Sequence, residues 1–292
     1  MDDIYFTLPC NVTCDYHKNS LGDYITPLPH TVELDGQWEV ALVELTFNKS
    51  WYNIWSEQQV GIQLEDLTFK RYVKEDTISP GRYTDVELVR RVNQLLAVHA
   101  NETMPGKDAK TGEPLLIRKP IESLSNMRIT QAPRIQLNSL TRKVTISIGK
   151  DTDGCNIMPV LGEEITSLLG FEAKDLELKS IVVDKNGEKQ LVASRAFDFE
   201  AGIYAIYVYS DIVKPNYVGD KSVQCLRVCS IPSDKKFGDT CTIAYSNPCY
   251  YPLSSKRFKD IRITLKDKTN TEIPFKFGET FVKLHLRRKN AL

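Results

Sequence analysis

The sequence predicts a mainly β fold: a jelly-roll β-sandwich that carries an inserted α+β module. Short β-prone segments separated by turn signals fill the first 75 residues and return in the last third of the chain, a pattern typical of sandwiches and jelly rolls. The middle differs, because its best segment has apolar residues at helical spacing. Since short connections keep consecutive elements adjacent, we expect residues 1–75 and 181–292 to form the sandwich and residues 76–180 to form the module.

The first part contains several predicted strands. Residues 4–8 are β-prone, and a polar loop at residues 11–22 separates them from residues 24–29. The prolines of residues 24–29 require the edge of a sheet or the end of a strand. Residues 38–47 are apolar on both faces, so this strand should be buried on both faces or curve into a sandwich. Residues 60–64 alternate apolar and polar side chains, which is typical of a half-buried strand.

The strongest helix signal lies in the middle of the chain, at residues 85–100. Thr84 can cap the first turn, and Glu87 three residues further on completes a capping box. The apolar residues form one stripe at helical spacing, made of Leu88, Val89, Val92, Leu95 and Leu96.

The rest of the middle mixes a loop, a hairpin and a shorter helix. Residues 101–128 are loop-like, whereas residues 134–138 and 143–148 predict a hairpin. A second helix is expected at residues 159–170, because its final glycine suits the left-handed position just past a helix end.

The last third returns to strands. Lys185-Asn186-Gly187 is a turn signal, and it predicts a hairpin between residues 182–183 and residues 190–192. Residues 261–265 alternate isoleucine and leucine with polar side chains, which gives the clearest one-sided strand of the chain. Three more strands are expected, at residues 203–209, 222–230 and 281–286.

Composition and charge exclude several classes of protein. The 292 residues are 41% hydrophobic and 26% charged, values typical of globular proteins. Lys plus Arg and Asp plus Glu both number 38, so the net charge is zero and a protein that coats nucleic acid is disfavoured. No apolar run reaches the roughly 18 residues of a membrane helix. The start lacks the features of a signal peptide, so we expect synthesis in the reducing cytoplasm or nucleus of a cell.

No catalytic, metal or cofactor site is predicted. The seven cysteines show the spacings Cys10-x3-Cys14, Cys225-x3-Cys229 and Cys241-x7-Cys249, which are looser than the pairs of most zinc sites. We interpret most of them as small buried hydrophobes, although a local link or metal at the two x3 pairs stays open. The serine-hydrolase, phosphate-loop and zinc-protease motifs are all missing, so we expect the protein not to be an enzyme.

The densest aromatic cluster is Trp51-Tyr52-Asn53-Ile54-Trp55. Trp51, Tyr52 and Trp55 are interface candidates, because tryptophan and tyrosine dominate binding hot spots. The favoured alternative is that they fill the core or a loop. A platform for stacking nucleic-acid bases would need interleaved basic residues, and only Lys49 is close.

The basic C-terminus is a second interface candidate. Arg287, Arg288 and Lys289 follow Lys283, and such a cluster can contact packaged DNA or an acidic neighbour. The favoured alternative is an exposed strand end that adds solubility.

The order of these segments resembles the minor capsid (penton) proteins of Maverick/Polinton-type viruses and transposons, a group that includes adintovirus-like and virophage-like members. The likeness runs nearly end to end. The segments that carry it are Ile4–Pro9, Leu34–Leu45, Gly81-x-Tyr83, Leu168–Phe171, Tyr207–Val213, Val218–Asp220, Leu226–Val228, Tyr251–Leu253, Arg257-Phe258, Ile261–Ile263 and Phe275–Gly278.

The resemblance implies a structural protein of the virion. It implies a jelly-roll subunit that forms homopentamers at icosahedral vertices, among trimers of a double jelly-roll major capsid protein. It carries over no catalytic residue and no cofactor, and it implies no membrane contact. Two alternatives stay open: a β-sandwich module that binds a ligand or a protein, and an enzyme whose site is assembled from distant residues.

Overall fold

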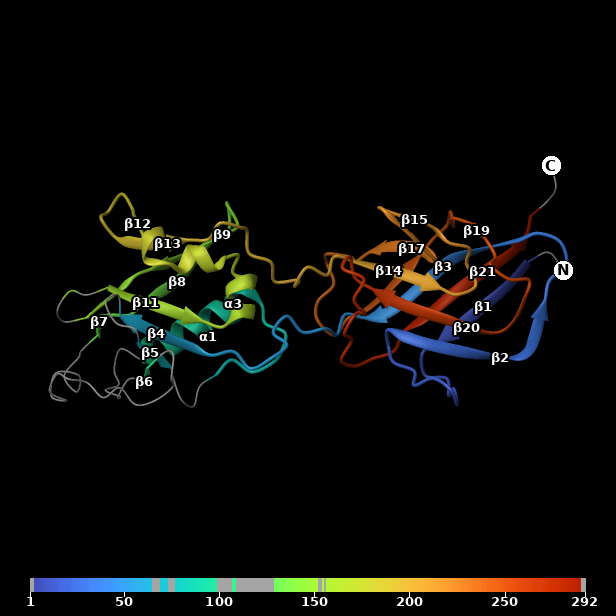
Figure 1. Ribbon diagram of the computed structural model, residues 1–292, viewed down its shortest axis with the longest axis horizontal. Helices are drawn as coiled ribbons and strands as arrows, with labels where there is room; N and C mark the ends of the chain where they lie inside the picture. Colours follow the sequence, from blue (N-terminus) through green and yellow to red (C-terminus); the bar gives the residue numbers. More distant parts are fainter. Residues whose placement is uncertain are drawn as a thin grey trace. The chain divides into compact units, whose positions relative to one another are not determined.

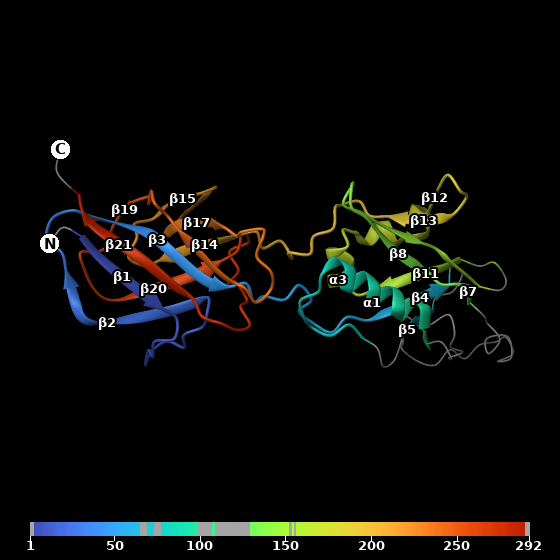
Figure 2. The ribbon, with the colours of Figure 1, turned by 180° about the vertical axis from the view of Figure 1, so that it is seen from behind.

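The computed structural model describes residues 3–64, 69–72, 77–98, 107–108, 129–151, 154 and 156–289. Contacts divide the chain into two compact units. The first combines residues 1–51 with residues 203–292, and the second is the continuous segment from Tyr52 to Gly202. Figures 1 and 2 show the first unit in blue and orange-red, the two ends of the sequence, and the second in the colours between them.

Two antiparallel sheets form the first unit. The strands are β1 (Asp3–Pro9), β2 (Asp23–Glu33), β3 (Trp38–Asn48), β14 (Ala205–Ser210), β15 (Asn216–Val218), β16 (Lys221–Val223), β17 (Cys225–Ser230), β18 (Thr240–Ala244), β19 (Tyr251–Pro252), β20 (Arg257–Lys266) and β21 (Phe281–Arg288). One sheet has the order β1-β21-β3-β18, with β19 also paired to β3, and the other has the order β17-β14-β20-β2. The short strands β15 and β16 form a separate hairpin.

The pairing in these sheets is nested. With β15, β16 and β19 set aside, the first strand pairs with the last, β1 with β21, and β2 then pairs with β20, β3 with β18, and β14 with β17. A long hairpin of eight strands rolled into two facing sheets gives this order. The first unit is a jelly roll. The second unit is inserted between its third and fourth strands, so the predicted fold class is confirmed.

A bulge in β3 explains why both alternating sets of its positions are apolar. Val43 is an extra residue, because Glu44 pairs with Lys283 and Leu42 pairs with Leu284. The apolar residues before and after it therefore face the same core, and not opposite sides as predicted; they are Val40, Leu42, Leu45 and Phe47. β3 is also an inner strand, because β21 pairs along one side of it and β18 along the other. The prolines of β2 lie at a sheet edge, as predicted, and the pairing of β2 with β20 is interrupted there.

The inserted module has its own sheets and helices. Its strands are β4 (Val60–Leu64), β5 (Phe69–Tyr72), β6 (Lys107–Asp108), β7 (Ile129–Gln131), β8 (Arg134–Asn138), β9 (Lys143–Ser147), β10 (Gly149–Asp151), β11 (Asn156–Leu161), β12 (Val182–Val183) and β13 (Lys189–Val192). The helices are α1 (Asp85–Val98), α3 (Glu163–Leu168) and the 3-10 turns η1 (Ala173–Leu176) and η2 (Leu178–Ser180). The sheets have the orders β6-β5-β4-β11-β10-β7 and β12-β13-β9-β8.

Helix α1 packs against β4 and β8 and supplies a large part of the module's core (Figure 2). The predicted capping box is present, because Thr84 Oγ1 accepts from the Glu87 amide at 3.2 Å and Glu87 Oε2 accepts from the Thr84 amide at 3.0 Å. Asn93 on the same helix donates to the carbonyl of Ile135 and accepts from its amide. These two bonds occupy backbone groups of the edge strand β8.

The boundaries of the module differ from the prediction of residues 76–180. Residues 60–64 pair with β11, and residues 182–192 form a hairpin on β9. Both therefore belong to the module, because alternation along a strand does not encode which sheet the strand joins. The predicted helix at 159–170 is also shorter, since residues 159–161 end β11. Gly170 does follow this helix with φ +81°. The predicted loop at 101–128 lies almost wholly outside the described residues.

Candidate functional site

The basic C-terminal strand does not form a single patch. Arg287 lies on the outer face of its sheet, where it pairs with Glu39 at 2.5 Å and stacks over the ring of Tyr250 at 3.4 Å. Arg288 takes the opposite face by strand alternation and lies beside Gly36. Lys289 continues the strand through a backbone bond to Gln37. Of these three residues, Arg287 already has its counter-charge within the jelly roll.

His285 lies at the centre of a cluster on the outer face of this sheet. Its ring stacks on Tyr5 with centroids 4.3 Å apart, Nε2 lies 2.9 Å from Asp3 Oδ1, and Nδ1 lies 2.7 Å from the Tyr250 hydroxyl. A neutral imidazole satisfies both contacts in one tautomer, with Nε2–H donating to Asp3 and Nδ1 accepting from Tyr250. The cluster joins the first described strand of the chain to the last one. Tyr5, Tyr250 and Asp3 were not predicted as site residues, although the alternation along residues 4–8 could have indicated the outward position of Tyr5.

The aromatic cluster at residues 51–55 is divided by the boundary between the two units. Trp51 is 1% exposed and packs in the jelly-roll core, with its ring 5.9 Å from that of Phe275. Tyr52 is half-buried at the start of the module. Trp55 is 37% exposed within the module. Trp51 therefore fills the core, and Trp55 presents surface to solvent.

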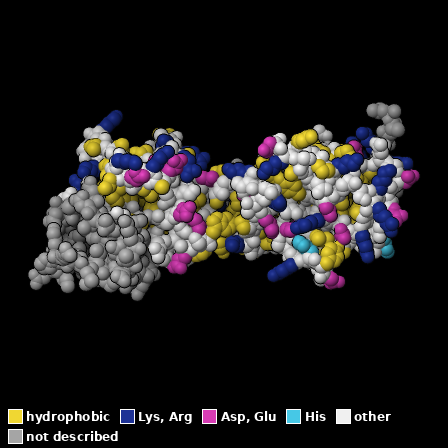
Figure 3. Space-filling view, in the orientation of Figure 1, with side chains coloured by type: hydrophobic (Ala, Val, Ile, Leu, Met, Phe, Trp, Pro, Cys, Tyr) yellow, Lys and Arg dark blue, Asp and Glu magenta, His cyan; other side chains and the backbone are white. Residues whose placement is uncertain are grey.

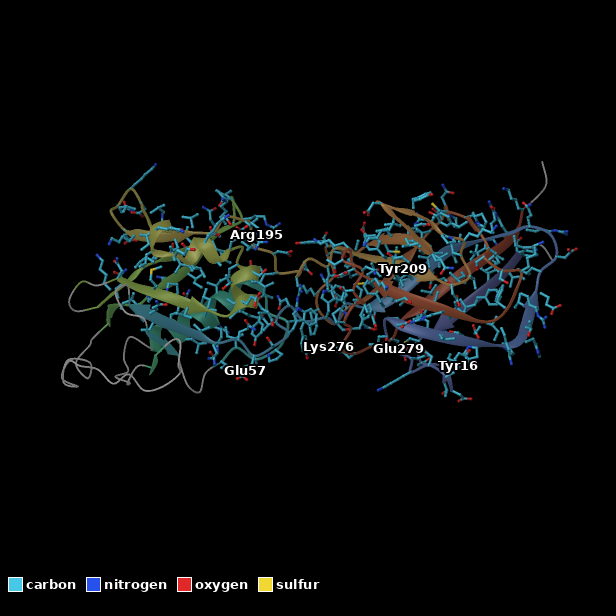
Figure 4. All side chains as sticks on the ribbon, in the orientation of Figure 1. Tyr16, Glu57, Arg195, Tyr209, Lys276 and Glu279 are labelled. Atoms are coloured by element: carbon cyan, nitrogen blue, oxygen red, sulfur yellow. The ribbon has the colours of Figure 1, made fainter. Side chains whose placement is uncertain are left out.

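A polar cavity of about 640 Å³ lies on the outer face of the sheet β17-β14-β20-β2. Asp23 and Arg262 form a two-pronged ion pair in its wall, with nitrogen–oxygen distances of 2.8 and 2.5 Å. Burial disfavours ionisation of Asp23, but the hydrogen bonds and charge of Arg262 outweigh it and lower the pKa of this carboxyl. Tyr209, labelled in Figure 4, lies in the same wall, with the Lys266 amine 5.7 Å from its ring. These paired charges hold the sheet face together and do not resemble a nucleophile with its base.

A second cavity of about 480 Å³ lies in the module. Trp55, Glu164 and Ser167 form one side of it, and Arg195 and Asp198 form the other. Figure 4 labels Arg195. Its charged side chains already have protein partners. Glu164 accepts from the Trp55 and Ser56 amides, Arg195 lies 3.7 Å from Glu172, and Asp198 accepts from the Glu200 amide.

The described cysteines and acidic residues hold no metal site. Cys10, Cys225, Cys229 and Cys241 are buried, and no pair among the described cysteines is linked. Burial raises the pKa of Cys225 to about 11, so this thiol stays protonated at neutral pH. No group of three or more histidine, cysteine or acidic side chains in the described ranges could hold an ion. Cys155 lies outside those ranges.

Charge on one face of the jelly roll is mixed rather than segregated. On the face of the jelly roll seen in Figure 3, basic and acidic side chains are intermixed. This agrees with the net charge of zero. No helix in the described part of the chain is long and apolar enough to cross a membrane.

Solved structures that are similar to this chain include two that match it over almost its whole length. One is the penton protein of mavirus, at 13% identity and a TM-score of 0.47, with 98% of this chain and 99% of that chain covered. The other is a chain of the Sputnik virophage structure determined by cryo-electron microscopy, at 11% identity and a TM-score of 0.47, with 99% and 98% covered. No family model and no curated protein matches the sequence.

Proposed function

We propose that this chain is a minor capsid (penton) subunit that forms homopentamers at the vertices of an icosahedral virion. The observation that carries the proposal is the nested strand order of the jelly roll, with a module between its third and fourth strands. The sequence resemblance described above spans both parts of this arrangement. The function follows from assembly rather than from a reaction.

The partners are copies of the chain itself and a double jelly-roll major capsid protein. A closed ring of five uses two different faces of each subunit, one against each neighbour. Such an interface buries more than ~1,000 Å² in total. The net charge of zero favours close packing, because little like-charge repulsion opposes it.

If the C-terminus contacts packaged DNA, Arg288 and Lys289 make that contact. Arg287 is already paired with Glu39, so a phosphate would have to compete with that carboxylate. Deletion of residues 287–292 should therefore lower the DNA content of particles less than deletion of a tail whose basic residues are all unpaired. Unchanged assembly and unchanged DNA content after this deletion would remove the C-terminus from the proposal.

Light scattering of the purified chain, across protein concentration and salt, tests the oligomer. The monomer mass is 33.2 kDa, so a species near five times this mass, with fivefold rings in negative-stain images, is the expected result. A strict monomer at high concentration, which also stays monomeric with the major capsid protein, would contradict the proposal. That result would favour the second candidate, a β-sandwich that binds a ligand or a protein.

A further inference from the structure

The chain covers the outer edges of two of its strands with its own polar groups. At the edge of β2, Asn19 accepts from the Ile25 amide at 2.9 Å and donates to the Ile25 carbonyl at 3.0 Å. Ser20 occupies the amide and the carbonyl of Asp23, at 2.8 and 2.9 Å, and Pro27 has no N–H to cover. Helix α1 covers β8 in the way described above. Such contacts keep another chain from pairing with these two edges.

The outer edge of β1 has no such cover. Among the described strands β1 pairs with β21 alone, and the Cys10 amide donates to Thr280 at 3.0 Å just beyond the end of the strand. Because bonded and non-bonded pairs alternate in an antiparallel ladder, every second residue of β1 directs its N–H and C=O groups away from β21. These residues are Asp3, Tyr5 and Thr7, and all are exposed. No described residue bonds to their outward backbone groups.

The strand β18, at the opposite edge of the same sheet, is open in the same way. The Lys49 amide donates to Asp239 at 3.0 Å, just before the first pair between β18 and β3. The same alternation then turns the backbone groups of every second residue away from β3. These residues are Thr240, Thr242 and Ala244, which are also exposed. Within the described ranges their outward groups have no partner.

The two open edges fit each other in direction and in phase. The path β1-β21-β3-β18 has four antiparallel strands, so β1 and β18 run in opposite directions. A rotation about a ring axis keeps the direction of each strand along that axis, so β1 of one copy meets β18 of the next copy antiparallel. At both edges the open backbone groups belong to residues with outward side chains, so pairing keeps the core-facing side chains of both sheets on one side.

Pairing of these edges would also remove apolar surface from water. Ile4, Phe6 and Ile243 are only partly buried at the rim of the jelly-roll core. With Tyr5 opposite Thr242, Ile4 lies opposite Ile243, and both lose exposed apolar area. The next outward position of β1 is Pro9, which has no N–H.

We propose that β1 of one copy pairs antiparallel with β18 of the next copy, with Tyr5 opposite Thr242. This contact rests on the proposed penton function, because it is the contact that joins neighbouring copies in the ring. The edges of the other jelly-roll sheet are less suited to it, since β2 is covered and the pairing of β14 with β17 has a bulge between Val208 and Tyr209.

Disulfide cross-linking of the full chain tests the contact. Thr7→Cys and Thr240→Cys place thiols on residues whose Cα atoms would lie about 5.5 Å apart across the junction, a separation that suits a disulfide. Cys14, Cys155 and Cys249 are first replaced with serine, so that the remaining native cysteines are the buried ones. On oxidation the double variant should form covalent oligomers of up to five chains. An equal mixture of the two single variants should form only dimers, and each single variant alone should stay uncrosslinked.

A proline variant tests the free edge without touching the ladder inside the sheet. Thr242→Pro removes an N–H that points away from β3, so it should leave the jelly roll folded and weaken association by about tenfold or more. Thr242→Ser keeps this N–H and is the matched control, which should associate like the unaltered chain. Thr7→Pro tests the opposite edge if circular dichroism shows that Thr242→Pro fails to fold. Light scattering measures the association.

The outcomes separate this contact from the penton proposal. Rings of five that form without cross-links, together with unaltered assembly of folded Thr242→Pro, would overturn the contact and leave the penton proposal standing. Cross-links within either single variant alone would show that like edges meet, which contradicts the head-to-tail arrangement. Cross-links of these thiols to the major capsid protein alone, identified in particles by mass spectrometry, would assign the edges to that partner instead. A chain that stays monomeric, alone and with the major capsid protein, would contradict both proposals.

Discussion

The jelly roll and the inserted module differ in how far along the chain their strands find partners. In the jelly roll, Asp3 pairs with Arg287 and Tyr24 pairs with Ile263. In the module, β4 pairs with β11 and β8 pairs with β9, all within one continuous segment. The jelly roll therefore needs both ends of the chain before its sheets can close, whereas the module needs only residues 52–202.

The two units also have separate cores. The buried cluster of the jelly roll and that of the module share no residue. Each unit thus has the basis for stability of its own, and we expect each to unfold in its own transition.

The largest expected effect comes from removing β21. Deleting residues 281–292 takes away the strand between β1 and β3, together with the buried side chains of Val282, Leu284 and Leu286. The jelly roll should unfold while the module stays folded. Hydrogen exchange of peptides measures this, with a chain that ends at Lys289 as the control. Loss of protection in α1 and β11 would show that the module depends on the jelly roll.

Matched core substitutions should give the next largest effect. Leu284 in the jelly roll and Leu169 in the module are both fully buried. Replacing either with alanine should cost about 2–5 kcal/mol of unfolding free energy, through lost burial and a cavity. In thermal unfolding followed by hydrogen exchange, each variant should destabilise only its own unit. If one variant destabilised both units equally, the claim that the units have separate cores would be wrong.

Asn53 should matter for the module alone. It is 1% exposed, and its amide group bonds to the Tyr83 amide and carbonyl and to the Phe199 carbonyl. These bonds join the segment that begins the module to the segment that ends it. Asn53→Ala leaves those backbone groups without partners, so it should cost about 1–3 kcal/mol. Denaturant unfolding measures the loss, and Asn186→Ala, at an exposed turn, should cost less than about 0.5 kcal/mol.

The smallest expected effect is that of low pH on the stability of the module. Burial opposes ionisation of Asp175, but hydrogen bonds from Glu172 at 2.8 Å and Ser194 at 3.1 Å outweigh it and lower the pKa of this carboxyl. Because the pKa of Asp175 is lower in the folded state, the ionised carboxylate stabilises the folded state above pH 4, about the ordinary carboxyl pKa. This stabilisation is lost as the pH falls through the pKa of Asp175 in the folded state.

Module stability should therefore decline below about pH 4, and Asp175→Asn should flatten that decline. Module-specific hydrogen exchange across pH checks this. The control, Asp220→Asn on an exposed turn of the jelly roll, should leave the module's profile as it was. An unaltered profile in Asp175→Asn would show that other groups control the acid response.

Much of the jelly roll could be predicted from sequence. β-propensity located residues 4–8, and strand alternation located residues 261–265 and 281–286. Residues 38–47 also form a strand, but their two apolar sets do not face opposite sides, because the bulge at Val43 turns both towards one core. The capping box of α1 was also predicted, because both of its residues are local. The boundaries of the module were not predicted, because the alternation along residues 60–64 is the same whichever sheet they join.

The candidate surfaces were less predictable. Arg287, Arg288 and Lys289 are adjacent in sequence, but strand alternation separates the first two and Glu39 neutralises Arg287. The partners of His285 come from the other end of the chain and from the segment after β18. No local pattern contains such contacts, so only the fold brings them together.

Cryo-electron microscopy of particles assembled from this chain and a double jelly-roll major capsid protein tests the penton proposal most directly. The expected result is fivefold density at the vertices in which β1-β21-β3-β18 and β17-β14-β20-β2 form the two sheets of each subunit, with the module as a second density per subunit. Vertices filled without this chain, or density for it only at other positions of the particle, would contradict the proposal.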